Sequence, residues 1–290
     1  MAAPLPTCYL NGQYLPLSEA RVSPLDRAFL FADAVYEVMP VYGRRPFRFN
    51  AHCDRLARSL NGIGMRDPHT REQWRHIFAT LIDRNATDDT YIYWQVTRGA
   101  EPGRNHTPLP DIPRTVFAFC APLPLSTPQQ LEHGAAAVTA ADTRWARCDL
   151  KTTALLANVL LRQLATDTGA TETILLRDGV LTEGSSSAVH VVIDGELRSP
   201  PQGPAILPGT TRGAVEKMAA RAGIPWRASP VSETELRSAS EIILSAAVRE
   251  TTPVTTLDGR PVGTGRPGPA WRAIHEQLQA YKQELSEKPW

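Results

Sequence analysis

Lys151 stands where the sequence pattern changes, and its amine is the first candidate for chemistry. The residues before it show no helical period, whereas the apolar residues of 154–165 recur at helical spacing. A lysine at such a break can be held rigidly while its amine points into a cleft. Its neighbours Leu150, Thr152 and Thr153 are uncharged, and desolvation favours the neutral amine that attacks a carbonyl. A solvated lysine at a helix start is the alternative interpretation.

A second candidate site is the segment Gly209-Thr210-Thr211, which opens a predicted helix over 210–223. The free backbone N–H groups of a helix N-terminus, together with two hydroxyls, bind anions, and phosphate fits such a site well. The alternative is that a threonine here is an ordinary N-cap.

Glu183 is the third candidate, because it lies between a predicted strand and a glycine–serine turn. Beneath an aromatic nitrogen heterocycle, its charge would keep the ring nitrogen protonated and make the ring an electron sink. A solvated glutamate is the alternative. The run Gly184-Ser-Ser-Ser-Ala188 also resembles the elbow of a serine hydrolase, but the second glycine of that motif is missing.

Tyr36, Arg104 and His106 are candidates for binding a carboxylate. Arg104 and His106 lie two residues apart in a segment over 98–110 that is too long for a hairpin turn. Arginine holds a carboxylate through two parallel hydrogen bonds, and histidine and tyrosine add donors around it. A solvated loop is the alternative interpretation.

The elements that must position these residues follow from the pattern of the chain. Asn11-Gly12 joins two short strands within 8–16, and a second hairpin spans 34–49. Alternation along its first strand places Tyr36 on the face opposite Val35 and Glu37. The other predicted elements are a helix capped by Asn50, a helix over 70–84, strands over 90–97, 114–120, 135–140, 171–176, 189–193 and 241–245, and helices over 154–166, 210–223 and 268–285.

This mixture of strands and helices, without an internal repeat, predicts an α+β fold. Residues 121–128 contain three prolines and no periodicity, so we place an interdomain linker there. The predicted domains are a smaller N-terminal α/β domain over 1–120, a linker over 121–129 and a larger C-terminal domain over 130–290.

The composition disfavours several classes of function. The chain has 290 residues, with 31 basic and 30 acidic side chains, and this balance indicates neither nucleic acid nor an anionic membrane as a partner. No apolar run could span a bilayer, and the N-terminus lacks the pattern of a signal peptide, so we expect a cytoplasmic protein. The four cysteines and seven histidines show no metal-ligand spacing. Dinucleotide and P-loop motifs are also missing.

Six segments, in order along the chain, carry a resemblance to one family. They are DAVYEV (33–38), HCDRL (52–56), QVTRG (95–99), RWARCDLK (144–151), TEGSSS (182–187) and GTTR (209–212). From about Tyr9 to the last predicted helix, the chain resembles the fold-type IV pyridoxal-phosphate enzymes, and among them the D-amino acid aminotransferases.

The resemblance implies pyridoxal 5′-phosphate as the cofactor, bound between two domains. It implies that Lys151 forms the internal aldimine and moves the proton between Cα and C4′. Glu183 would pair with the pyridine nitrogen, and Leu207 would pack on the ring. The further residues implied for cofactor binding are Arg55, Ser187, Thr210 and Thr211, of which Arg55, Thr210 and Thr211 would hold the phosphate.

The resemblance also implies that Tyr36, Arg104 and His106 bind the substrate α-carboxylate, with the loop donated by the partner subunit of a homodimer. Fixing the carboxylate on one side, with Lys151 on one face of the cofactor, leaves a single enantiomer with its Cα–H directed at the amine. The predicted reaction moves the amino group of a D-amino acid, such as D-alanine, to a 2-oxo acid, such as 2-oxoglutarate or pyruvate.

Two departures from the family pattern stand out. The spacing from Arg98 to Arg104 is one residue longer than expected, and residues 246 and 247 are alanines where the family offers hydroxyls near the phosphate. Arg249 is the candidate to compensate or to contact the substrate. The alternative functions are an aminodeoxychorismate-lyase-like enzyme or an (R)-amine transaminase of the same fold, and a cofactor-free binding protein.

Overall fold

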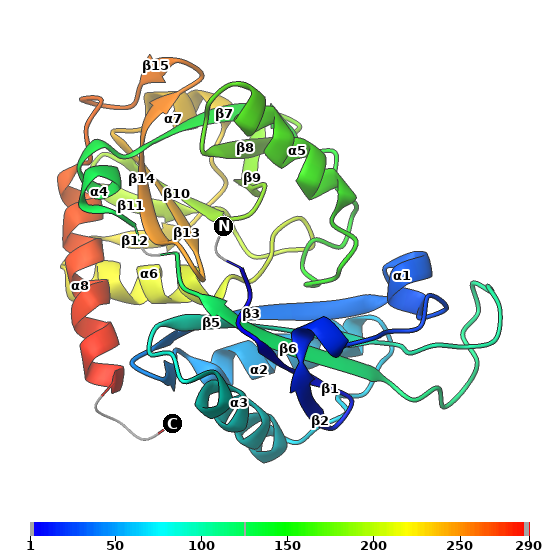
Figure 1. Ribbon diagram of the computed structural model, residues 1–290. Coiled ribbons are helices and arrows are strands. Elements are labelled where there is room, and N and C mark those ends of the chain that lie inside the picture. The colour runs from blue at the N-terminus through cyan, green and yellow to red at the C-terminus, as the bar shows by residue number, and fades with distance from the viewer. Residues whose placement is uncertain (1–2, 125, 287–289) are drawn as a thin grey trace. The chain divides into compact units, whose positions relative to one another are not determined.

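The computed structural model describes residues 3–124, 126–286 and 290, which fold into two compact units (Figure 1). The first unit contains 3–124, the short segment 150–155 and residue 290, and the second contains 126–149 and 156–286. By its packing, Lys151 therefore belongs to the first unit. The domain division at 121–129 stays a prediction, and residue 125 of that linker lies outside the described residues.

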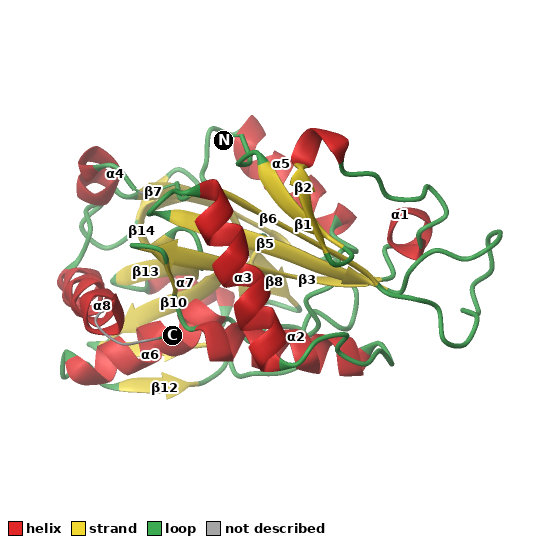
Figure 2. Cartoon of the chain, turned by 60° about the horizontal axis from the view of Figure 1, so that its bottom comes forward, coloured by secondary structure: helices red, strands yellow, loops and turns green. Residues whose placement is uncertain are grey.

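The first unit is built on a six-stranded antiparallel sheet in the order β2-β1-β6-β5-β3-β4 (Figure 2). The first hairpin turns at Asn11 and Gly12, which both have positive φ angles, as predicted. The bounds of the strands are β1 (Thr7–Leu10), β2 (Gln13–Pro16), β3 (Ala34–Tyr42), β4 (Arg45–Pro46), β5 (Thr90–Thr97) and β6 (Thr115–Pro122).

Helices α2 (Phe49–Gly62) and α3 (Arg71–Asn85) pack against this sheet. Their apolar faces form one core with the strands, in which the rings of Trp74, Phe78 and Trp94 contact one another. The prediction that Asn50 caps α2 is wrong. The N-cap is Arg48, whose left-handed backbone lets the helix begin at Phe49, so Asn50 already lies in the first turn. The short elements η1 (Leu17–Glu19) and α1 (Arg27–Phe31) precede β3.

The second unit contains a mixed sheet in the order β12-β11-β10-β13-β14-β7-β8-β9, with β15 paired to β14. Strand β7 runs parallel to both β14 and β8, and β11 runs parallel to β12. The bounds of the strands are β7 (Ala135–Ala141), β8 (Glu172–Arg177), β9 (Val180–Gly184), β10 (Ala188–Ile193), β11 (Glu196–Ser199), β12 (Trp226–Ala228), β13 (Glu241–Ala246), β14 (Glu250–Leu257) and β15 (Arg260–Pro261).

Helices pack against several strands of this sheet. Helix α5 packs on β7 and β8, and α6 packs on α8 and β13. Sheets and helices of these kinds confirm the predicted α+β class. Among the described residues, no helix is both long and apolar enough to cross a membrane. The bounds of the helices are α4 (Pro128–His133), α5 (Leu156–Asp167), α6 (Thr210–Arg221), α7 (Glu233–Ser238) and α8 (Pro269–Ser286).

Candidate active-site residues

Lys151 is held against strand β3 of the first unit. Its carbonyl accepts a hydrogen bond from the N–H of Tyr36 at 2.9 Å, and its own N–H donates to Oγ of Ser59 at 3.1 Å. The next residue, Thr152, forms a β-bridge with Val35. The segment around Lys151 therefore pairs with β3, which explains why the helical period begins only after it, at α5.

The amine of Lys151 contacts the side chain of Tyr36. Nζ donates to the phenolic oxygen at 3.3 Å and lies 4.3 Å from the centre of the ring. Tyr36 in turn stacks on Tyr93, with 5.6 Å between the ring centroids. The stacking restricts the tyrosine ring, so the half-buried amine has a fixed neighbour.

Arg55 is fixed by a carboxylate on the opposite side of β3 from Tyr36. Glu37 is fully buried and accepts from Nε and Nη2 of Arg55 at 2.7 and 2.8 Å, and His52 Nδ1 lies 2.8 Å from the same carboxylate. Burial opposes ionisation of Glu37, but Arg55 and His52 outweigh it and lower its pKa to about 2. Glu37 therefore holds the guanidinium in place as an ion pair inside the core.

In the second unit, Glu183 is a nearly buried carboxylate near the end of β9. One oxygen accepts from Nη1 of Arg144, and the other accepts from the N–H of Leu207 at 3.1 Å. Arg144 also binds Asp142 at 2.9 Å. Burial opposes ionisation of Asp142, but Arg144 outweighs it and lowers the pKa of Asp142. Arg144 thus orients the Glu183 carboxylate beside Leu207.

The turn after Glu183 is organised by a second buried carboxylate, Glu172. It accepts from the hydroxyls of Ser185, Ser186 and Ser187, the last two at 2.9 Å, and from the N–H of Ser185 at 3.1 Å. Glu172 is 1% exposed, so these donors satisfy a carboxylate that water does not reach. The hydroxyl of Ser187 faces Glu172, and its role toward a cofactor stays a prediction.

Helix α6 begins at Thr210, and Gly209 is its N-cap residue. Glycine has no side chain that could accept a hydrogen bond from the first turn. Thr210 and Thr211 are each 8% exposed. The first N–H groups of α6 and two hydroxyls thus lie together, as an anion site requires. Where β13 turns into β14, residues 246 and 247 are alanines without a hydroxyl, and Arg249 is exposed.

Arg104 and His106 lie in the loop over 98–114 that joins β5 to β6, and both are exposed. Each packs on the ring of Phe31 in α1: the Arg104 guanidinium at 4.7 Å and the His106 ring at 5.4 Å. Among the hydrogen bonds, ion pairs and ring contacts of the described residues, none joins them to Tyr36. The structure therefore places Tyr36 beside Lys151, and Arg104 and His106 both against Phe31, as two separate groups.

Comparisons with known proteins identify the family of the chain. The amino-transferase class IV family model matches residues 34–257, and the chain therefore belongs to the class IV aminotransferases. It is similar to the D-alanine aminotransferase of Staphylococcus aureus strain MSSA476, with 37% identity over 274 residues, or 94% of this chain and 96% of the relative. The D-alanine aminotransferase of Bacillus licheniformis is 35% identical over 269 residues, or 93% and 94% of the two chains.

Solved structures support the same family at the level of the fold. The branched-chain amino acid aminotransferase of Escherichia coli superposes with a TM-score of 0.89 at 26% identity, covering 95% of this chain and 94% of that one. The branched-chain aminotransferase of the archaeon Thermoproteus uzoniensis, solved with norvaline, has a TM-score of 0.86 at 25% identity, covering 98% and 95%. The fold-type IV architecture predicted from the resemblance is confirmed.

Several residues that organise the site were not singled out from the sequence. Glu37 lies inside the segment DAVYEV, where strand alternation separates it from Tyr36 but gives no sign of its partner Arg55. Arg144 lies in a segment of the resemblance without an assigned role. Glu172 is 13 to 15 residues from the serines it binds, and a lone glutamate at a strand start carries no local signal.

Proposed function

We propose that this chain is a D-amino acid aminotransferase, which moves an amino group from a D-amino acid such as D-alanine to a 2-oxo acid such as 2-oxoglutarate or pyruvate. The observation that carries this proposal is its similarity to D-alanine aminotransferases over 93–96% of the chain at 34–37% identity. The amine of Lys151, held against Tyr36, supplies a candidate base for the reaction.

We further propose pyridoxal 5′-phosphate as the cofactor, and two features of the structure fit it. The N-terminus of α6 suits a phosphate, and the Glu183 carboxylate held by Arg144 suits a protonated ring nitrogen. When bound, the cofactor withdraws electrons from the substrate and makes its Cα–H acidic. The residues that would hold it are Arg55, Lys151, Glu183, Ser187, Leu207, Thr210 and Thr211.

The protein's own part in the reaction is to place a base and a carboxylate clamp. Lys151 Nζ would accept the proton from Cα and deliver it to C4′ of the cofactor, and Tyr36 keeps the amine in position by its hydrogen bond. Arg104, His106 and the Tyr36 hydroxyl bind the substrate carboxylate. With the carboxylate fixed on one side and the base on one face, only one enantiomer directs its Cα–H at the amine.

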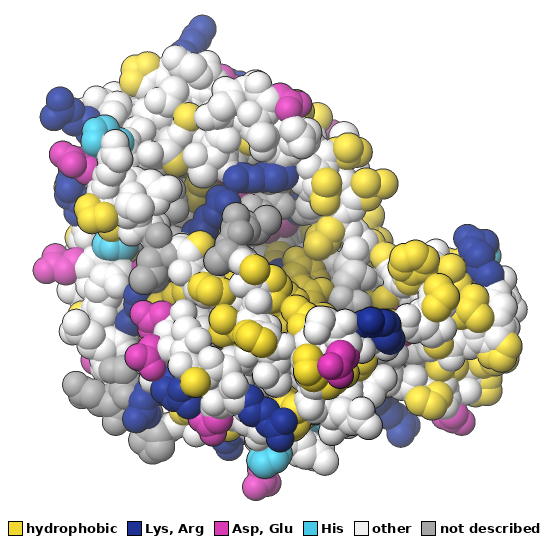
Figure 3. All heavy atoms as spheres, in the orientation of Figure 1, with side chains coloured by type: hydrophobic (Ala, Val, Ile, Leu, Met, Phe, Trp, Pro, Cys, Tyr) yellow, Lys and Arg dark blue, Asp and Glu magenta, His cyan; other side chains and the backbone are white. Residues whose placement is uncertain are grey.

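We propose that the protein is a homodimer in which each loop 98–114 serves the site of the other copy. Arg104 and His106 pack on Phe31 and make no described contact with Tyr36, which supports a site completed by a second chain. Helix α5 adds an exposed apolar surface: hydrophobic side chains gather over it (Figure 3), and Leu156 and Leu160 are 72% and 62% exposed. Sedimentation velocity should give twice the chain mass of 31.8 kDa, and a monomer would contradict the proposal.

The cysteines support a reducing compartment, and we propose the cytoplasm. All four are buried free thiols: Cys8, Cys53, Cys120 and Cys148. Proteins with unpaired cysteines are typical of the reducing cytoplasm. We expect small-molecule substrates as partners, because the charge balance offers no surface for nucleic acid or membranes.

The direct test is an absorption scan of the purified protein during titration with D-alanine and then, on a fresh sample, with L-alanine. We expect a near-visible band of the bound cofactor that D-alanine converts and L-alanine leaves in place. Conversion by L-alanine alone would contradict the D-amino acid assignment. A protein that shows no such band after incubation with pyridoxal 5′-phosphate would contradict the cofactor.

A further inference from the structure

Arg27, the first residue of α1, is almost fully buried at the base of the loop 98–114. The residue before it, Asp26, caps α1 and accepts hydrogen bonds from the hydroxyls of Thr97 and Thr115 at 3.0 and 2.6 Å. Thr97 ends β5 and Thr115 begins β6, the two strands that the loop connects. The start of α1 and the base of the loop are therefore bound together, and Arg27 projects from this junction.

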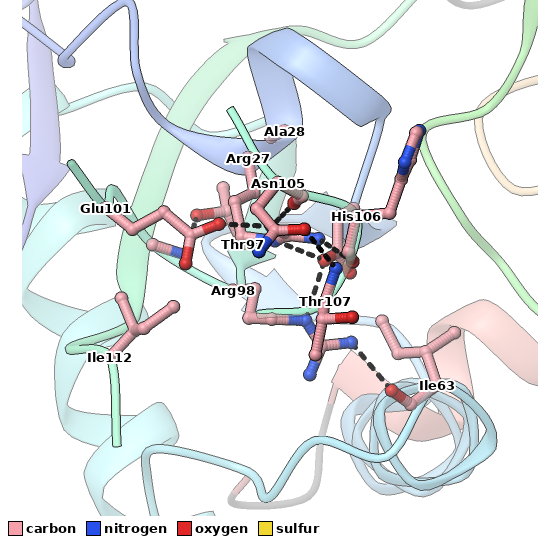
Figure 4. Close-up of polar contacts among 12 residues, drawn as sticks. Arg27, Ala28, Ile63, Thr97, Arg98, Glu101, Asn105, His106, Thr107 and Ile112 are labelled. Carbon is pink, nitrogen blue, oxygen red and sulfur yellow. Dashed lines mark hydrogen bonds and ion pairs between the residues drawn. The ribbon is translucent and has the colours of Figure 1, made fainter. Parts of the chain in front are cut away.

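The guanidinium of Arg27 binds the backbone of the loop. Nη1 donates to the carbonyl of Asn105 at 2.6 Å, and Nη2 donates to the carbonyl of His106 at 2.9 Å, as Figure 4 shows. The side chains of 102–107 are exposed. The turn is instead held by its backbone, through the two carbonyls that accept from the buried guanidinium of Arg27. Such bonds fix the backbone that carries Arg104 and His106.

Two carboxylates share the same guanidinium. Nε donates to Asp33 at 2.9 Å, and Nη1 also binds Oε1 of Glu101. The second oxygen of Glu101 accepts from the N–H of Leu109 at 3.0 Å, which closes the loop across its other side. Arg27 is thus the common partner of both carboxylates and of both carbonyls of the turn.

Phe31, one helical turn after Arg27, connects this network to the exposed side chains. The guanidinium carbons of Arg27 and of Arg104 both lie 4.7 Å from the centre of its ring, and the His106 ring is 5.4 Å away. Cation–π contacts of this kind hold a guanidinium over an aromatic ring. The side chains of Arg104 and His106 therefore meet on one ring.

We propose that Arg27 is a positioning residue for the substrate carboxylate: by holding the carbonyls of Asn105 and His106, it makes Arg104 and His106 present their donors side by side. This inference rests on the proposed function, because it takes Arg104 to bind the carboxylate. Arginine suits the task since its planar fork offers donors to two acceptors at once. A lysine would keep the charge between the carboxylates without that fork.

The test compares Arg27→Lys with the parent in half-reactions with D-alanine and with D-alaninol, which lacks the carboxylate. We expect kcat/KM for D-alanine to fall at least about ten-fold and that for D-alaninol to stay unchanged. The matched control is Arg71→Lys, since Arg71 also donates to a carboxylate, Asp54, and to a carbonyl, that of Asn50. The control should behave like the parent with both substrates.

A mutant cycle with the variant Arg104→Ala/His106→Ala shows whether Arg27 acts through those two side chains. If it does, Arg27→Lys lowers kcat/KM for D-alanine no further once both are alanine. Losses that multiply in the triple variant would overturn the inference, as would an equal loss with D-alaninol. If Arg104→Ala alone leaves D-alanine unaffected, the proposed carboxylate clamp itself is wrong, whereas a loss in Arg104→Ala without one in Arg27→Lys refutes only the inference.

A second measurement reports how firmly the loop is held and does not depend on catalysis. Trypsin cleaves after Arg104, and a turn held by two carbonyl bonds is cut slowly because the protease needs an extended, mobile segment. Arg27→Lys should be cut at Arg104 several-fold faster than the parent and than Arg71→Lys, with the rest of the chain equally resistant. Equal cleavage rates at Arg104, or loss of resistance throughout the chain, would overturn the positioning role.

Discussion

Tyr36 and Lys151 are joined twice, once through their side chains and once through their backbones. The lysine Nζ donates to the phenolic oxygen at 3.3 Å, and the tyrosine N–H donates to the lysine carbonyl at 2.9 Å, across 115 residues of sequence. The backbone hydrogen bond fixes the register of the two segments. It therefore places the lysine side chain next to the tyrosine ring. The amine is therefore positioned before any substrate arrives.

Replacing Lys151 with alanine should abolish transamination and the near-visible absorbance of the bound cofactor. The amine is the proposed base and the proposed point of attachment, and no other lysine pairs with Tyr36 among the described residues. The measurement is an absorption spectrum together with a D-alanine half-reaction. Unchanged absorbance in Lys151→Ala would refute the assignment.

The matched control is Lys217→Ala, which removes a lysine in α6 whose amine lies 4.9 Å from the centre of the Tyr281 ring. That lysine faces another aromatic ring, so the comparison separates loss of the reactive amine from loss of any lysine–aromatic contact. Lys217→Ala should keep both spectrum and activity.

Mixing an inactive variant with an impaired one should raise activity if the loop 98–114 serves the other copy. Lys151→Ala lacks the base and Arg104→Ala lacks the clamp, but a mixed dimer contains one site with both residues intact. We expect about a quarter of parental activity after random exchange of subunits, since half of the dimers are mixed and each has one working site. No recovery after verified exchange would place Arg104 in the site of its own chain.

Glu37→Gln should destabilise the first unit by about 3–5 kcal/mol, because it leaves Arg55 as a buried charge without its carboxylate. The pKa of Glu37 is lowered from 4.5 to about 2, so its contribution is present above about pH 4.5 and is lost as the pH falls toward 2. The difference in unfolding free energy between parent and variant should therefore shrink as the pH falls below 4.5. Urea titrations at several pH values measure it.

The control for this series is Asp83→Asn, which breaks an exposed ion pair with Arg44. Exposed pairs contribute about 0–1 kcal/mol, so this variant should follow the parent at each pH. A Glu37→Gln protein as stable as Asp83→Asn at pH 7 would show that the buried pair makes no net contribution.

Glu172→Gln should loosen the serine turn and weaken retention of the cofactor. The side-chain amide of the new glutamine would place N–H donors where three serine hydroxyls already donate. We expect this mismatch to lower the stability of the protein by about 2 kcal/mol. Since Ser185–Ser187 directly follow Glu183 and Gly184, dialysis should remove the cofactor from this variant faster than from the parent. The half-buried Glu233, paired with Arg237 at the surface, supplies the control Glu233→Gln; identical loss rates in both variants would contradict the prediction.

Local signals in the sequence predicted elements well where the interactions are themselves local. The turn at Asn11-Gly12 needs only residues that tolerate positive φ, and Thr70 caps α3 through Gln73, three residues away. The break at Lys151 was visible because the helical period starts only after it. Asn50 failed as a cap because the left-handed conformation of Arg48 starts the helix two residues earlier.

The contacts that complete the site depend on residues far apart in the chain, which a single sequence does not reveal. Arg27 reaches Glu101 and the carbonyls of Asn105 and His106 across 74 to 79 residues. Strand β14 is not predicted from the sequence, partly because Pro253 interrupts its strand-like pattern. In the structure, Pro253 nevertheless pairs with Ile243 in the sheet. Motifs of a family predict which residues react, while the residues that hold them in place appear only in three dimensions.

The six residues 150–155 pack with the first unit, although the chain on either side of them belongs to the second unit. A cut between the two units near residue 125 would therefore produce no self-sufficient half. The N-terminal fragment would keep β3 and Tyr36 but lose Lys151, and the C-terminal fragment would carry Lys151 without the strand that it pairs with. Recombining the fragments, rather than isolating either, is the only route by which a split version of this enzyme could regain its chemistry.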